Sequence, residues 1–537
     1  MGGDGSRERV RYRFGPLERR GLVAGWRGGQ VLVVATGLVV ATAFLRGHPT
    51  VGGVLLALVG VAVSAGLATW PLRGRTGDQW LPLVVRWLAS GLGGRRSVVT
   101  VPPTFGAPPH PGRVGHVPAP GARLSWRLPA SGSLFPAISL DARATIGPFR
   151  GLAIRATPLP DAGNGPRAGI VVDDRARTVT AVLAVPAGNF ALLGPAEQDA
   201  RVAAWSQVLA SLAREGSDIQ RVQWIETSLP DHGEGVRAHL RRSARHGPDT
   251  APGASYASLV ERSMPTTRRH RVLLALSVRM RRETGTGSRR GPAGADRLVR
   301  ELGQLHSLLG SADVDVEGVL SDRMVAGACR EAVATMAELE RPEVTAAVAD
   351  AAPDGGGAGG IVVGRSPAWP WPTAMDVRWD SLRTDGTWHA TYWIAEWPRQ
   401  DVAPDFLAPL LLAPVRRSLS LVMEPVAPAR AAREVARART SDLADRELRR
   451  RGGFLVTARQ NREREGVERR DAELADGHAQ YRYSGYVTVT AETRDGLRDA
   501  CAAAEQAAGQ SRMELRLLYG EQDVAFACTL PLARGLG

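Results

Sequence analysis

Two uncharged apolar segments near the amino terminus constrain the fold of this chain more than any other feature. The first runs from Gly28 to Leu45 and the second from Val51 to Leu72, and the connection between them holds a single charged residue, Arg46. At about 1.5 Å per residue, the 18 residues of the first segment reach ~27 Å, close to the ~30 Å hydrocarbon core of a bilayer. Because backbone polar groups in lipid must be satisfied within a segment, the pattern predicts two membrane-spanning helices joined by a tight turn.

The arginines around these segments predict their orientation. Twelve arginines flank the pair, namely Arg7, Arg9, Arg11, Arg13, Arg19, Arg20, Arg27, Arg73, Arg75, Arg86, Arg95 and Arg96. Since positive charge favours the cytoplasmic side, we expect a multi-pass cell-membrane protein with both termini in the cytoplasm and the turn outside. A cleaved signal peptide and a buried hairpin of a soluble protein are the alternatives. Two long uncharged segments flanked by arginine favour the membrane hairpin over both.

The net positive charge of the chain is weak evidence about its binding partners, although the charge is large. The net charge is +14, which is typical of proteins that bind nucleic acid or an anionic surface. However, all 68 basic residues are arginine and none is lysine, a composition typical of GC-rich coding. We therefore give the charge little weight, although arginines beside the hairpin can contact anionic lipid headgroups. The three cysteines, Cys329, Cys501 and Cys528, have neither a disulfide framework nor a CxxC spacing, which suits a reducing cytoplasm.

The pattern after the hairpin predicts an α+β fold in two cytoplasmic domains. The expected parts are a basic amino terminus (1–27), the hairpin (28–72), an amphipathic helix and Pro/Gly-rich linker (73–120), a first α+β domain (121–350), a Gly-rich linker (351–360) and a second α+β domain (361–537). The amphipathic helix, residues 77–92, contains Trp80 and Trp87. Two interpretations stay open for it: a helix in the membrane interface, or a helix that docks on the first domain.

In the first domain, apolar runs alternate with helical periodicity. Strands are expected at 169–172, 178–185, 219–227 and 271–279, and helices at 196–214, 296–309 and 321–339, with a further helical stretch between the last two strands. Asp173 and Asp174 lie between the first two strands, where a hairpin turn favours aspartate. We favour this turn over a cation site for the two carboxylates.

The second domain opens with six tryptophans interleaved with arginines: Trp369, Trp371, Trp379, Trp388, Trp393 and Trp397. Such rings could stack single-stranded nucleic acid. The alternation of Trp388, Ala390, Tyr392 and Ile394 favours one buried face of a strand instead, either in the core of a sheet or at an interface. Further strands are expected at 418–424, 454–457, 483–491 and 513–519, and helices at 429–451, 461–477 and 493–508, the last capped by Thr493. This succession predicts a ferredoxin-like or split βαβ layer.

The sequence offers no catalytic constellation that we can support. The ten histidines stand singly, without HExxH spacing, and GxSxG and GxGxxG motifs are missing. The Gly-rich run at 354–360 lacks the Gly-Lys-Ser/Thr ending of a phosphate-binding loop. Glu396 lies in an apolar setting, but a glutamate at a sheet edge or in an ion pair is the favoured interpretation. We therefore predict no catalytic, cofactor or metal site, and a protein that is not an enzyme.

Five stretches carry a likeness to known proteins: Arg11–Gly29, Ala390–Leu412, Arg417–Pro425, Arg451–Thr457 and Leu515–Leu532. Together they resemble an actinobacterial family of membrane proteins from conjugation-type, type IV secretion-like gene clusters, and the likeness covers most of the chain. The second domain alone also resembles the amino-terminal, non-motor region of conjugative secretion ATPases. This chain has no Walker motifs, so ATP hydrolysis is not implied.

The resemblance implies a membrane-anchored structural and docking subunit whose cytoplasmic domains meet a secretion ATPase and a PrgI-like membrane protein, as a homo-oligomer within a larger complex. The partner-interface candidates are Trp388, Tyr392, Trp393, Glu396, Trp397, Phe406 and Tyr519. Two alternatives remain. The first is the membrane component of a type VII (ESX-type) secretion system, which also has a hairpin and an α+β body. The second is a membrane-tethered protein that binds single-stranded nucleic acid, with an affinity that falls as salt rises.

Overall fold

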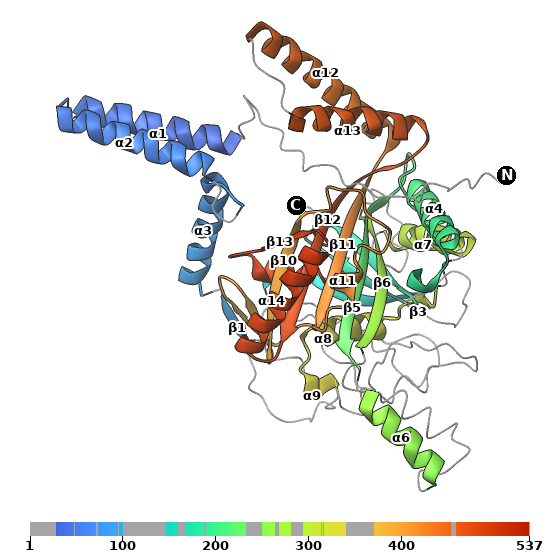
Figure 1. The fold of residues 1–537 in the computed structure, drawn as a ribbon. Helices are drawn as coiled ribbons and strands as arrows, with labels where there is room; N and C mark the ends of the chain where they lie inside the picture. The colour runs from blue at the N-terminus through green and yellow to red at the C-terminus, as the bar shows by residue number, and fades with distance from the viewer. Residues whose placement is uncertain are drawn as a thin grey trace, which may run out of the picture.

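The computed structural model describes residues 28–47, 49–70, 74–94, 96–99, 147–158, 167–186, 190–231, 250–263, 268–280, 294–312, 314, 316–339, 370–452 and 458–535. Its elements form an α+β body with an apolar helical hairpin extending from it (Figure 1). The predicted basic terminus, the linkers at 101–120 and 351–360 and the strand at 454–457 lie outside the described residues.

The hairpin consists of α1 (Gly28–Gly47) and α2 (Val51–Thr69), and the Thr50 hydroxyl caps α2 by accepting a hydrogen bond from the backbone N–H of Gly53 at 3.1 Å. Small residues lie where the two helices meet: a Cβ on Gly37 would overlap the side chain of Ser64. The large side chains point outward, so that most of the leucines and valines are exposed. Small residues inside and large apolar residues outside are typical of helices packed in lipid.

A single sheet forms the body. Its strand order is β1-β8-β9-β10-β12-β11-β5-β6-β4-β3-β2, with β13 paired to β10 and β7 paired to β4, and all pairings are antiparallel. The strands are β1 (Ser97–Val99), β2 (Leu152–Pro158), β3 (Arg167–Asp173), β4 (Thr178–Val185), β5 (Ile219–Pro230), β6 (Arg268–Arg279), β7 (Gly318–Val319), β8 (Ala374–Val377), β9 (Leu382–Thr384), β10 (Thr387–Glu396), β11 (Arg417–Val426), β12 (Gln480–Ala491) and β13 (Glu514–Leu517).

The two halves of the body repeat one order of elements. In the first, β4 leads through α4 (Pro195–Leu212) to β5, and β6 leads through α7 (Ala295–Ser311) to β7, giving the spatial order β7-β4-β6-β5. In the second, β10 leads through α11 (Ala408–Leu411) to β11, and β12 leads through α14 (Arg494–Gln510) to β13, giving β13-β10-β12-β11. Each set follows a pair of antiparallel strands, β2-β3 or β8-β9. The halves therefore have matching topology.

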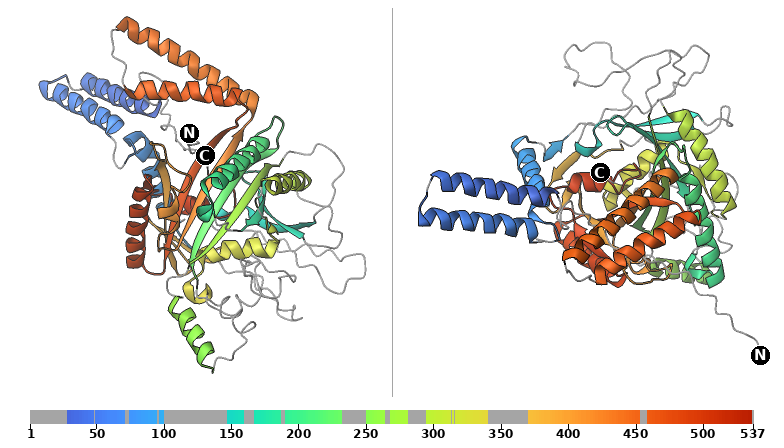
Figure 2. Two further views of the ribbon diagram at one scale, coloured as in Figure 1. Left: turned by 45° about the vertical axis from the view of Figure 1, so that its right-hand side comes forward. Right: turned by 90° about the horizontal axis from the view of Figure 1, so that it is seen from above.

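Helical insertions also occupy matching positions. α6 (Ala251–Ser263) lies between β5 and β6, and α12 (Pro428–Gly452) and α13 (Ala458–Ala475) lie between β11 and β12. Figure 1 shows α6 at the bottom of the body and the α12–α13 pair at the top. The two insertions project in different directions in Figure 2 as well.

The halves join edge to edge through β5 and β11, with registers from Arg417 opposite Ser228 to Met423 opposite Val222. The sequence led us to expect two α+β domains; in the structure, strands of both segments belong to one sheet, in which β11 pairs with β5. The expectation did not anticipate this because strand pairing across roughly 190 residues leaves no local signal in the sequence.

Three hydrophobic cores cover the sheet. On one face each half has its own core, under α4 and α7 in the first half and under α11 and α14 in the second. The third core is shared: it combines side chains from η1 (Gly147–Phe149), α8 (Asp322–Val333), α15 (Gln522–Ala527) and strands of both halves. Phe149 of the first half, for example, stacks on Trp371 of the second at 5.6 Å between ring centroids.

Most predicted elements coincide with observed ones, with one break. The helix expected at 321–339 ends at Val333, where Ala334 is extended, and resumes as α9 (Met336–Leu339). The turn at Asp173 is confirmed, since its Oδ1 accepts hydrogen bonds from the backbone N–H groups of Arg175 and Ala176 at 3.0 and 2.9 Å. The Thr493 cap is confirmed by its hydroxyl accepting from the N–H of Gly496 at 3.0 Å.

Gln223 holds the centre of the junction. Its fully buried amide donates to Ser420 Oγ at 2.8 Å and to the carbonyls of Cys528 and Leu530 at 2.9 and 3.0 Å, and accepts from the N–H of Ala533 at 2.7 Å.

We predict that Gln223→Ala lowers the free energy of unfolding by about 3 kcal/mol, because it leaves several buried groups unpaired. Denaturant unfolding of the detergent-solubilised protein measures the change. Gln207→Ala, on the exposed face of α4, is the control and should stay within about 0.5 kcal/mol; equal effects would refute the role of Gln223.

Candidate membrane anchor and partner surfaces

An aromatic cluster joins the hairpin to the body. It is built by α3 (Gly77–Leu92), in which Trp80 and Trp87 are seven residues apart and so share one face. Trp80 stacks on Trp379 with 5.9 Å between ring centroids, and Trp87 meets the same ring edge-on at 5.1 Å. Tyr519 closes the cluster at 6.0 Å from Trp80. The helix therefore docks on the second half of the body, next to β8 and β13.

Charged contacts surround this cluster. Glu521 accepts from Arg86 at 2.8 Å and from Arg75 at 3.4 Å, and Arg516 donates to the carbonyl of Gly74 at 3.1 Å. The Arg96 guanidinium lies 3.3 Å from the centroid of Trp87. These groups are partly exposed, so each ion pair contributes little, about 0–1 kcal/mol. These contacts mainly orient α3, because they fix its rotation on the body.

Two of the partner-interface candidates lie in the core. Trp388 is 9% exposed and Tyr392 is 3% exposed, both in the core beneath α14. The Tyr392 hydroxyl donates to Glu505 Oε1 at 2.8 Å, and burial is the main reason that its pKa is raised. The predicted buried face of this strand is thus observed, and both rings are part of the core of the body.

Of the other candidates, Glu396 and Trp397 lie at the end of β10 and Phe406 packs against Trp397, whereas Trp393 lies on the face of β10 opposite Tyr392 and Ile394. Trp393 is partly buried and donates to Ser484 Oγ at 3.1 Å, and Glu396 forms an ion pair with Arg399. Trp397 packs edge-on against Phe406 at 6.5 Å between ring centroids. An open groove of about 600 Å³ lies beside them, lined by Glu396, Trp397, Arg399, Gln400, Arg512, Met513 and Glu514. This surface, which we call the Trp397 groove, is lined by one aromatic ring and four charged side chains.

Tyr519 does not join that groove, because it belongs to the anchor cluster with Trp80. Sequence reasoning missed its partners Trp379 and Glu521 as anchor residues. The seven-residue spacing of Trp80 and Trp87 was a usable signal for one side of the contact. Nothing in the local sequence marks the other side, because Trp379 and Tyr519 are brought together by the fold.

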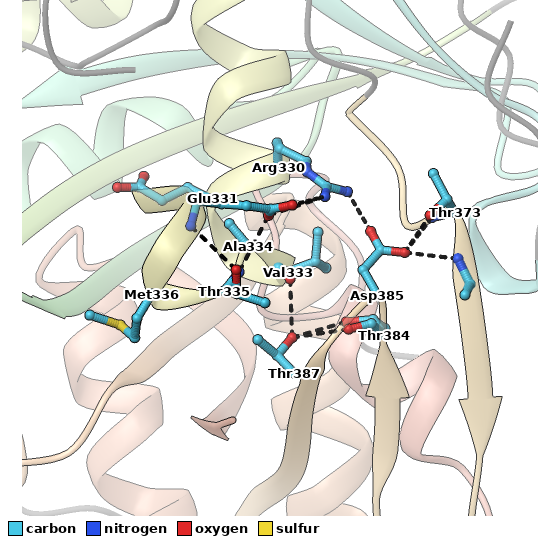
Figure 3. A network of polar contacts seen from close by, with 12 residues as sticks. Arg330, Glu331, Val333, Ala334, Thr335, Met336, Thr373, Thr384, Asp385 and Thr387 are labelled. Atoms are coloured by element: carbon cyan, nitrogen blue, oxygen red, sulfur yellow. Dashed lines mark hydrogen bonds and ion pairs between the residues drawn. The ribbon is translucent and has the colours of Figure 1, made fainter. Parts of the chain in front are cut away.

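A polar network ties α8 to the second half (Figure 3). Arg330 forms an ion pair with Asp385, whose other oxygen accepts from the N–H groups of Thr373 and Ala374, each at 2.8 Å. Thr387 donates to the carbonyl of Val333 at 3.1 Å at the end of α8. The network thus satisfies orphan groups at a helix end and in a strand turn.

His389, Cys329 and Cys528 are buried inside the body. His389 Nε2 contacts Thr384 Oγ1 at 2.7 Å and Nδ1 contacts Thr490 Oγ1 at 2.9 Å, while burial holds its pKa well below the ordinary value, with Arg416 adding to the effect. Burial raises the pKa of Cys329 to about 12 and that of Cys528 to about 12. Within the part of the chain that the structure describes, no three His, Cys, Asp or Glu side chains are placed to share a metal ion.

No family model matches the chain, and no curated protein matches it.

The charge of Asp385 gives a pH-dependent prediction. Burial alone would raise the pKa of this carboxyl, but hydrogen bonds from Thr373 and Ala374 and the Arg330 guanidinium hold it below its ordinary value. Its stabilising contribution is therefore complete above the unfolded pKa of about 3.9 and is lost as pH falls through the lower folded value. We predict that Asp385→Asn destabilises the protein at pH 7 and that the difference from the parent shrinks below about pH 4. Asparagine suits the positive φ of 50° here. Melting temperatures from pH 7 to pH 3 measure this; a constant difference would contradict it.

Proposed function

We propose that the chain is a membrane-anchored structural and docking subunit of a type IV secretion-like complex, with its body in the cytoplasm. The observation that carries the proposal is the junction of α3 with Trp379 and Tyr519, which joins the apolar hairpin to the body at a fixed place. An anchor on a flexible linker would leave the body free to move. This one presents the body in a defined orientation to whatever it binds.

The hairpin supports the membrane part of the proposal. α1 and α2 are both long and apolar enough to cross a bilayer, and very little of either is buried. A core helix of a soluble protein is mostly buried, and a signal peptide is a single short apolar segment rather than a pair. The connection between the two helices contains one arginine, Arg46, whereas twelve arginines flank the pair on its other side. The positive-inside rule therefore supports a cytoplasmic body.

The topology of the body supports its likeness to the non-motor region of secretion ATPases in one respect only, the order of strands and helices in a single layer. We infer that the order β13-β10-β12-β11, with α11 and α14 as crossovers, is a split βαβ layer, and that β7-β4-β6-β5 is a second one. Fold alone does not fix function. The docking role depends on surfaces, and the Trp397 groove is the surface that we propose for the secretion ATPase.

Arginine in the groove gives a test with a matched control. Arg399 and Arg498 both form exposed i, i+3 ion pairs, with Glu396 and Asp495, but only Arg399 lines the groove. We predict that Arg399→Glu lowers recovery of the ATPase with affinity-purified full-length protein about tenfold, equivalent to ~1.4 kcal/mol, whereas Arg498→Glu leaves it unchanged. Equal recovery with both variants would refute the groove as the docking surface. Recovery of ESX-type proteins in place of a conjugation-type ATPase would favour the type VII alternative.

The orientation of the hairpin gives a second prediction. Gly47 lies at the turn with open space around its Cα, and Leu412 is 74% exposed on the body. In a Cys501→Ser background, a Gly47→Cys variant should react with a membrane-impermeant maleimide on intact cells. A Leu412→Cys variant should react only after permeabilisation. The reverse pattern would place the body outside the cytoplasm.

A further inference from the structure

The helix α3 carries a second face that the body does not use. Leu81, Val85, Leu88 and Leu92 are 61%, 57%, 51% and 93% exposed. Their spacing of four, three and four residues aligns them in one stripe along the helix. Because Trp80 and Trp87 occupy the neighbouring face, the helix is apolar on two sides at once, and one of them is uncovered.

The position of α3 shows what lies beside this stripe. In Figure 1 the helix runs across the body end of the hairpin, nearly at right angles to α1 and α2, and the view from above in Figure 2 agrees. Its first residue is in close contact with the hairpin: a Cβ on Gly77 would lie 2.6 Å from the carbonyl oxygen of Leu67 in α2. A helix across the end of a membrane-spanning pair lies along the membrane surface.

The rotation of α3 turns the stripe toward the hairpin. The Asp78 side chain lies against Gly29 of α1, so this side of the helix faces the hairpin. At about 100° per residue, the centre of the stripe lies about 50° from Asp78 and about 130° from Arg86. Arg86 lies on the other side of α3 from the apolar stripe, where it forms an ion pair with Glu521 of the body. The uncovered apolar residues thus lie on the side where the bilayer begins.

We propose that α3 is an interfacial helix whose face Leu81–Val85–Leu88–Leu92 inserts into the headgroup and acyl boundary of the cytoplasmic leaflet, while Trp80 and Trp87 hold the body. The inference rests on the proposed membrane anchoring, and it adds a second lipid contact to the hairpin. Lipid is the occupant because the stripe is continuous with the apolar hairpin surface, where Leu67 and Trp70 are 56% and 75% exposed. Helices of this kind bury their apolar face about 5–10 Å into the interface.

Two contacts with the bilayer have a mechanical consequence. The hairpin alone would set the depth of the chain in the bilayer but would allow the hairpin and the body to tilt together relative to the membrane. A helix that lies in the interface and is clamped to the body by Trp379 prevents the body from tilting. The Trp397 groove would then be held at a constant height above the membrane.

Spin labels in lipid nanodiscs test the proposal with the full-length chain. In the Cys501→Ser background, labels are placed at Val85→Cys and Leu88→Cys, with Leu56→Cys in α2 (62% exposed) as the lipid reference and Leu412→Cys (74% exposed) as the water reference. Collision with molecular oxygen, which concentrates in lipid, is compared with collision with a water-soluble nickel chelate.

The expected result is that labels at 85 and 88 collide with oxygen at least three times more readily than with nickel, as at 56, whereas the label at 412 shows the opposite preference. Labels at 85 and 88 that are nickel-accessible, or shielded from both probes, while position 56 is lipid-like would overturn the interfacial helix and leave the hairpin anchor intact. If position 56 itself is nickel-accessible, the membrane anchoring fails and the interfacial helix fails with it.

Discussion

The pairing of β5 with β11 is the interaction on which the rest of the body depends. The two strands belong to different halves, and their junction buries an ion pair between Glu226 and Arg417, at 3.2 Å, whose side chains are 4% and 0% exposed. His270 contacts the same carboxylate at 2.7 Å. A buried ion pair is costly to form and adds little net stability, but removing either partner alone leaves an unpaired charge in the core. The register of the two strands is therefore strongly specified.

Each half then extends a segment over the other. The end of α8 in the first half is capped by the second, since Arg416 donates to the carbonyls of Ala334 and Glu331, each at 2.8 Å. In return, the carboxy-terminal segment of the second half crosses the first, where Arg534 forms an ion pair with Asp173 at 2.6 Å. Because α3 docks on the second half, this exchange fixes the hairpin relative to the entire sheet, including the part that α3 does not touch.

Local physics in the sequence predicted the elements better than their arrangement. The apolar hairpin, the alternation from Trp388 to Ile394, the Thr493 cap and the Asp173 turn each depend on residues within a few positions of one another, and each was predictable. The shared sheet depends on the pairing of β5 with β11, a contact without a local signature in the sequence.

The same limit applies to the candidate site. Trp388 and Tyr392 were expected on a buried strand face, covered either by the core of the sheet or by a partner, and the local alternation could not distinguish the two. They lie in the core because β10 is an inner strand covered on both faces: His389 and Thr391, on its other face, are fully buried as well. Of the anchor cluster, which α3 and two distant segments form, only the side on α3 could be predicted from the local sequence.

The most direct test of a single body with two interlocked halves is to divide the chain and express residues 1–350 and 361–537 as separate polypeptides. We predict that the second piece aggregates alone, because β11 becomes an open edge and the shared core is exposed, and that it stays folded and co-purifies with the detergent-solubilised first piece when the two are expressed together. A second piece that is monomeric, soluble and cooperatively folded by itself, with no affinity for the first, would show that the two halves are independent domains.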